Sequence, residues 1–160
     1  MQTVAVEGGV IISAELSESP VDQGQLLPAL ISAQRVLAQI GSETPIQQVL
    51  ADTGYWSGPQ ITTLQEQGMH VLVAPRTGHA RTPQTLGGQA RAMRAELDTA
   101  AGKTAYKRRS AIVEPVFAQI KHNRGITRLL RRRREHAQSE VTLIATTHNL
   151  LKLRTALGSP

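Results

Sequence analysis

The residues best suited to chemistry on a phosphate lie in the segment 104–125, which combines a single carboxylate, Glu114, with several cations. If residues 111–123 form a helix, Glu114 and Lys121 lie on one face, because side chains seven positions apart line up. A carboxylate offers hard oxygen ligands to a metal ion, and a cation meets phosphate charge. The same spacing also fits a solvated basic helix with one isolated acid, and spacing alone leaves both interpretations open.

A second candidate is Asp52, which follows the short apolar run Val49–Ala51. A helix over 57–68 and another apolar run at 70–74 come next, and strand, helix and strand in so few residues predict a parallel crossover. Asp52 would then lie at the carboxyl end of a strand, where sites in open α/β sheets gather. Asp-Thr-Gly is also ordinary turn chemistry, so a purely structural role is the alternative. The neighbouring Tyr55 and Trp56 could stack on a base or pack in the core.

Other kinds of site find little support. The five histidines have no metal-ligand spacing, and there are no cysteines for zinc, disulfides or thiol chemistry. Among them, His148 is interpreted as a helix residue with a hydrogen-bonded ring and not as a base. Neither glycine pair is followed by the Lys-Ser/Thr of a phosphate-binding loop, and no Gly-x-Gly-x-x-Gly occurs.

The remaining elements are those of an α/β protein. Two β-branched runs at 3–6 and 10–16 flank Gly8-Gly9, which predicts a two-residue hairpin turn. Helices are expected from Gln25 to Ile40, over 90–101 with a stop at Gly102, and over 140–157. Residues 76–90 are predicted to be a loop or an insertion, and no internal repeat or clear domain boundary is found.

Positive charge is concentrated in one part of the chain. The formal net charge is +6, and residues 103–134 hold eleven Lys or Arg against one acid. This distribution favours a polyanionic partner such as DNA. The run Arg131–Arg134 is either solvated charge or a phosphate contact. No signal peptide or membrane span is recognised, so a cytoplasmic protein without a membrane partner is expected.

Three motifs resemble DDE-type insertion-sequence transposases. YKRRSAIVEPVFAQIK resembles the family's C-terminal acidic motif, in which Tyr106, Arg109, Glu114 and Lys121 match its Tyr, Arg, Glu and Lys. Four residues separate Arg109 from Glu114, where the commonest signature has three. VLADTGYWSGPQI resembles the motif of the second catalytic Asp, which is Asp52 here, and HNLLKL resembles the closing helix.

The resemblance implies a ribonuclease-H-like α/β fold, with a mixed sheet flanked by helices, that cleaves and joins DNA strands with Mg²⁺ or Mn²⁺. Asp52 and Glu114 would be catalytic and metal-binding. DNA would be contacted by residues that belong to or follow the acidic motif: Tyr106, Lys107, Arg108, Arg109, Lys121, Arg124 and Arg128. The expected partners are DNA, a second copy of the chain in a transposition complex, and an upstream fragment carrying the first Asp.

Residues 1–160 are therefore expected to be part of a DDE catalytic domain without its first strand, because neither Glu7 nor Glu15 matches the family's first Asp. Metal binding would then be weak, one sheet edge would be exposed, and this chain alone would be inactive. Two alternatives remain: a non-catalytic, basic DNA-binding remnant, and an unrelated α/β protein with a basic tail.

Overall fold

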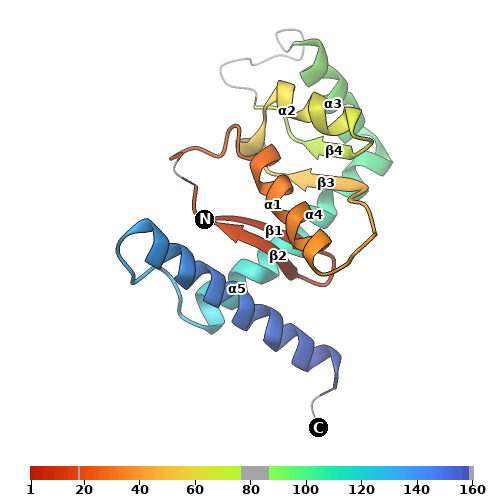
Figure 1. Ribbon diagram of the computed structural model, residues 1–160. Coiled ribbons are helices and arrows are strands. Elements are labelled where there is room, and N and C mark those ends of the chain that lie inside the picture. Colours follow the sequence, from red (N-terminus) through yellow and green to blue (C-terminus); the bar gives the residue numbers. More distant parts are fainter. Residues whose placement is uncertain (18, 77–86, 159–160) are drawn as a thin grey trace. The chain divides into compact units, whose positions relative to one another are not determined.

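The computed structural model describes residues 1–17, 19–76 and 87–158, which form two compact units. The first unit comprises Met1–Glu18, Ala29–Ser42 and Ser110–Pro160, and the second comprises Ser19–Pro28 and Glu43–Arg109. The chain contains both helices and short strands, and they alternate over residues 26–73, which confirms the predicted α/β class (Figure 1). The described strands form two two-stranded sheets, one in each unit, and not one mixed sheet.

The first unit contains an antiparallel hairpin of β1 (Gln2–Val6) and β2 (Val10–Glu15). Its turn spans three residues, 7–9, and not the predicted two, and Gly8 and Gly9 have φ angles of 85° and 73° that favour glycine. The pairing shifts register between Val4 and Ala5, which leaves Ile12 as an extra residue on β2.

Helix α5 (Arg134–Ala156) lies along β2 and covers its outer edge (Figure 1). The Asn149 side chain accepts from the backbone N–H of Ile11 (2.9 Å) and donates to its carbonyl (2.7 Å). The Gln138 side chain likewise accepts from the backbone N–H of Leu16 (2.8 Å) and donates to the carbonyl of Ala14 (2.9 Å). Backbone groups that a further strand would have paired are therefore paired by side-chain amides on this edge.

His148 belongs to the same contact between helix and hairpin. Its ring is fully buried, and Nε2 lies 2.8 Å from the carbonyl oxygen of Gly9. A carbonyl can only accept, so Nε2 carries the proton and donates. The interpretation of His148 as a hydrogen-bonded helix residue is confirmed, although its partner is the hairpin turn. Next to it, Ile11, Val116, Ile120 and Ile144 form the apolar core of this unit.

The second unit contains β3 (Gln48–Ala51) and β4 (His70–Val73), which pair in parallel and are connected through α2 (Gly58–Glu66). The predicted crossover is thus confirmed. Its core includes Ile61, Leu64 and Val71–Val73, which are all at most 1% exposed. Residues 77–86 of the predicted 76–90 loop lie outside the described residues, and α3 (Gly88–Asp98) begins within the rest.

Helix α4 (Ala100–Ala118) carries the acidic motif and begins earlier than predicted. The helical structure is interrupted at Thr99, between α3 and α4. The Thr99 hydroxyl accepts from Gly102 N–H at 2.9 Å and so caps α4. The predicted stop at Gly102 is wrong, because Gly102 is helical and is required for close packing. A Cβ at this position would lie 2.0 Å from the Glu96 carbonyl oxygen.

Two helices begin at positions that differ from the prediction. Helix α1 (Leu26–Gln39) starts one residue after the predicted Gln25 and carries Ser32, whose hydroxyl donates to the Glu15 carboxylate. Helix α5 starts at Arg134, six residues before the predicted start at Glu140. No helix within the described ranges is long and apolar enough to cross a bilayer.

Candidate functional site

Asp52 directly follows β3, at the carboxyl end of the parallel pair, and its side chain is exposed. Its Oδ1 accepts from Thr53 N–H at 2.7 Å and so caps η1 (Thr53–Tyr55), a short 3₁₀ turn. The turn role considered from the sequence is therefore real. It is compatible with metal binding, because a carboxylate has two oxygens and several acceptor directions.

A second acid, Asp22, lies beside the same turn. A Cβ on Gly54 would be 3.0 Å from Asp22 Oδ2, so the carboxylate lies directly against the backbone of this glycine. Burial, followed by the negative charges of Asp22 and Asp52, raises the pKa of Tyr55 to about 12. Tyr55 therefore remains protonated at physiological pH next to both acids.

Sequence reasoning did not associate Asp22 with Asp52. Asp22 lies just before α1, and its carbonyl accepts from Gln25 N–H at 3.0 Å. The contact with Gly54 is long-range, and no local spacing indicates it.

Tyr106 connects α4 to the strand that ends at Asp52. Its hydroxyl donates to the carbonyl oxygen of Ala51 at 3.0 Å, and the guanidinium of Arg109 lies 5.5 Å from the centre of its ring. Ala51 immediately precedes Asp52, so this bond fixes the backbone from which the carboxylate projects. The predicted DNA contacts of Tyr106 and Arg109 stay predictions. Tyr106 also has a structural role, which is its hydrogen bond to the Ala51 carbonyl.

Glu114 is exposed on α4, between Val113 and Pro115. Pro115 has no N–H to donate within the helix, yet α4 continues through it to Ala118. The next turn, η3 (Gln119–Asn123), is π-helical, so the predicted regular helix over 111–123 is correct only as far as Ala118. Lys121 lies in this wider turn, with its ammonium 5.6 Å from the centre of the Phe117 ring.

The remaining predicted DNA-binding residues differ in their surroundings. Lys107, Arg108 and Arg128 are exposed. The guanidinium of Arg124 instead donates to the carbonyl oxygen of Ile144 (3.1 Å) and to the hydroxyl of Thr147 (2.5 Å), both on α5. Arg124 therefore ties the segment after η3 to the last helix, whatever else it binds.

The donor chemistry of the two predicted catalytic acids suits a hard divalent ion, because both are exposed carboxylates. Asp52 belongs to the second compact unit and Glu114 to the first. Over residues 1–17, 19–76 and 87–158, no group of three or more His, Cys, Asp or Glu side chains is arranged to hold a metal ion.

Comparison with known protein families identifies the chain. The sequence model of the family described as "Transposase DDE domain" matches residues 3–150, which is most of the chain. The chain belongs to the transposase DDE domain family. Membership implies a function in DNA transposition and an interaction with DNA, and the family typically uses a divalent metal ion. Searches of curated proteins and of solved structures gave no match.

Proposed function

We propose that this transposase-family chain supplies two carboxylates, Asp52 and Glu114, to a metal-dependent site that cleaves DNA strands and transfers them. The observation that carries the proposal is the family match over residues 3–150, which includes both acids and the residues around them. The position of Asp52 after a buried parallel strand supports it, because such strand ends are where α/β sheets build their sites. A ribonuclease-H-like arrangement of the complete domain is part of this proposal.

The ion chemistry determines what the acids must do. Two divalent ions, when bound, would activate the attacking oxygen and stabilise the leaving oxygen of a phosphodiester. Asp52 and Glu114 would hold these ions through carboxylate oxygens. Tyr106 would keep the Asp52 backbone in place through its bond to the Ala51 carbonyl. Tyr55, which remains protonated, would add no negative charge beside Asp52.

Positive side chains near the acids would bind the DNA backbone. Lys107 and Arg108 are exposed on α4, the helix that also carries Glu114. Lys121 is exposed in the π-helical turn that follows, with its side chain directed by the Phe117 ring. A cation held in one direction loses less entropy when it meets a phosphate than a freely rotating one.

The proposal is tested by DNA cleavage and strand transfer with Mg²⁺ or Mn²⁺, measured on the protein in its complete natural form. Asp52→Asn and Glu114→Gln should each abolish metal-dependent cleavage while DNA binding persists. Glu66→Gln is a matched control, because Glu66 is an exposed acid at the end of α2. Cleavage retained by either site variant would contradict the assignment. A DNA-binding module without catalysis would bind DNA and never cleave it, with or without these substitutions.

A further inference from the structure

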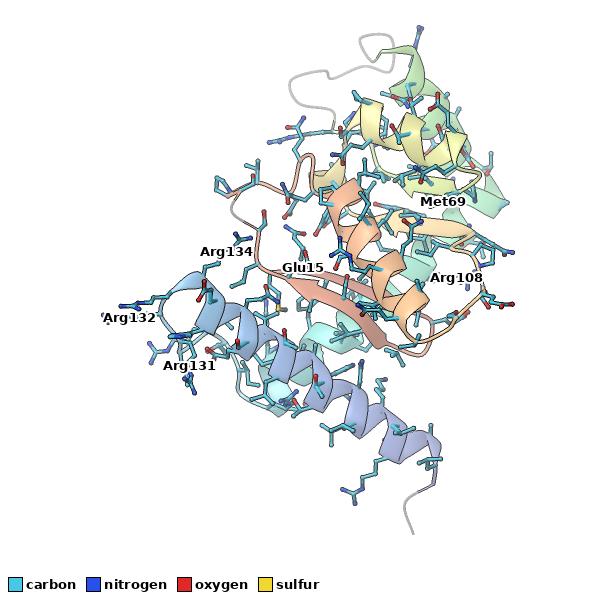
Figure 2. The ribbon with its side chains drawn as sticks, in the orientation of Figure 1. Glu15, Met69, Arg108, Arg131, Arg132 and Arg134 are labelled. Atoms are coloured by element: carbon cyan, nitrogen blue, oxygen red, sulfur yellow. The ribbon has the colours of Figure 1, made fainter. Side chains whose placement is uncertain are left out.

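The basic run that leads into α5 forms an exposed turn. We call residues 130–134 the arginine turn. Arg131, Arg132, Arg133 and Arg134 are all exposed, and Figure 2 shows Arg131 and Arg132 projecting outward at the start of α5. The guanidinium of Arg134 already donates one hydrogen bond, because its Nη2 lies 3.4 Å from the carbonyl oxygen of Leu16.

The backbone of this turn is held by the side chain of Glu140, a residue of α5. Both carboxylate oxygens of Glu140 accept from Leu130 N–H (2.9 and 3.0 Å), and Oε2 also accepts from Arg131 N–H at 2.8 Å. These backbone bonds, followed by the charge of Arg131, lower the pKa of Glu140, so the carboxylate is ionised at neutral pH. Upstream, Ile126 and Leu129 pack against the apolar core of the unit.

Arg133 shows that this conformation is imposed on the chain. Its φ of 67° is the one positive value at a non-glycine residue within the described ranges. Such backbone conformations are disfavoured for residues that carry a Cβ and persist only where the surroundings hold them. The turn therefore presents its arginines from a backbone that Glu140 holds through three hydrogen bonds.

The positive charge of the turn is only partly compensated, by the negative charge of Glu140 beside Arg131. Among the described residues, no carboxylate forms an ion pair with Arg131, Arg132 or Arg133. Glu140 and Glu135 are the acids nearest in sequence, and the Glu140 oxygens are used by backbone N–H groups. Guanidinium groups match phosphate oxygens with two parallel hydrogen bonds, which an ammonium cannot do.

We propose that the arginine turn is a built binding site for the phosphate backbone of duplex DNA, with Arg131, Arg132 and Arg133 as its contacts and Glu140 as its positioning residue. The proposal rests on the proposed function for the choice of DNA as the polyanion. It adds a surface that the transposase motifs do not include, since the acidic motif ends at Lys121 and the closing-helix motif begins at His148. The site should be insensitive to base sequence, because phosphate contacts carry no sequence information directly.

The first test compares two triple variants that remove the same charge. Arg131→Ala/Arg132→Ala/Arg133→Ala removes the contacts, and Arg35→Ala/Arg76→Ala/Arg91→Ala removes three exposed arginines elsewhere. Binding of a labelled duplex is measured against salt concentration. Each lost phosphate contact should reduce the slope of log affinity against log salt by about 0.9, so the turn variant should lose about 2.7. Equal losses in both variants would overturn the site, since only overall charge would then matter.

The second test separates an organised turn from simple charge attraction. Glu140→Ala removes a negative charge, so long-range electrostatics alone predicts tighter DNA binding. An organised turn predicts the opposite, a severalfold weaker affinity, because two backbone N–H groups lose their acceptor and the arginines lose their fixed positions. Circular dichroism confirms that the helix still forms. Unchanged or tighter binding by Glu140→Ala would contradict the proposal.

Two further ligands identify the source of the phosphate. Duplex RNA of the same sequence and vesicles containing phosphatidylserine are tested in parallel with DNA. Preference for RNA or for vesicles over DNA would overturn the choice of ligand. Asp52→Asn should leave binding at the turn intact, so a failure of catalysis and a failure of this site give different results.

Discussion

The hydroxyl of Tyr106 donates a hydrogen bond of 3.0 Å to the carbonyl oxygen of Ala51, the residue immediately before Asp52. The bond joins the helix that carries the acidic motif to the strand that presents the other predicted catalytic acid. Its two ends are far apart in the sequence, so it belongs to the tertiary structure and not to either motif alone.

Tyr106→Phe should therefore destabilise the fold and disturb Asp52 without removing any charge. We expect a loss of about 1 kcal/mol in unfolding free energy, because the Ala51 carbonyl loses its donor. The ring remains, so the contact with Arg109 is kept. Urea unfolding measures the stability, and Mn²⁺ titration measures metal affinity, which should also fall. Wild-type values for both would show that the hydroxyl does not position this strand end.

Titration of Tyr55 tests the cluster of Asp22, Asp52 and Tyr55. Its pKa should be near 12 and not 10.0, as measured by the difference in ultraviolet absorbance of tyrosinate between the unmodified protein, which has two tyrosines, and Tyr55→Phe. Asp22→Asn should lower this pKa more than Asp52→Asn, and burial should keep it above 10.0 in both. A pKa insensitive to both substitutions would mean that the acids lie too far from the hydroxyl.

The same shift has a consequence for stability. The raised pKa means that the folded state holds the Tyr55 proton more tightly than the unfolded state. The associated stabilisation is complete below about pH 10 and is lost as the pH rises towards 12. Tyr55→Phe should remove this part of the alkaline loss of stability, which pH-dependent urea unfolding measures.

Local sequence patterns predicted the parts of the fold that depend on local order. The β-branched runs that flank Gly8-Gly9 correctly predicted the hairpin, although its turn has three residues and not two, and the apolar runs on either side of α2 correctly predicted the parallel crossover. They also correctly placed Asp52 at a strand end. Helix ends were less predictable, because Thr99 caps α4 through its own hydroxyl and Gly102, a usual stop signal, is needed inside the helix for packing.

Side-chain contacts between distant segments could not be read from the sequence. Ser57 and Gln60 have the spacing of a local capping box at the start of α2, yet Ser57 makes no side-chain cap bond. Gln60 instead accepts from Leu27 N–H at 3.1 Å and donates to the Gly24 carbonyl at 2.6 Å. The contact of Asp22 with Gly54 is of the same kind. Such pairs depend on tertiary packing, which overrides local propensity.

The edge of β2 offers a test of how α5 is attached. Asn149→Ala removes both partners of the Ile11 backbone and should cost about 2 kcal/mol in unfolding free energy. Thr146→Ala, at an exposed position on the same helix, is the control and should change stability by less than about 0.5 kcal/mol. Equal effects of the two substitutions in urea unfolding would show that the Asn149 amide does not anchor the helix.

A substitution of Arg124 should affect stability, and a substitution of an exposed cation on α4 should affect DNA binding. Arg124→Ala should lower the unfolding free energy by about 2 kcal/mol, because its guanidinium donates to two acceptors on α5. Lys107→Ala should leave stability almost unchanged and reduce the salt slope of DNA binding by about 0.9. A flat salt dependence of the unmodified protein would reject phosphate binding by this segment.

The most direct test of the central claim is whether Asp52 and Glu114 hold the same metal site. Fe²⁺ with ascorbate and peroxide, bound in place of Mg²⁺, cuts the backbone close to the ion, and the cuts can be mapped by mass spectrometry. Metal-bridging carboxylates must reach ions about 4 Å apart, so we expect cuts around both Asp52 and Glu114. Asp52→Asn or Glu114→Gln should abolish both groups of cuts, and Glu66→Gln should abolish neither. Cuts near only one of the two acids, or cuts that survive both substitutions, would contradict the shared metal site.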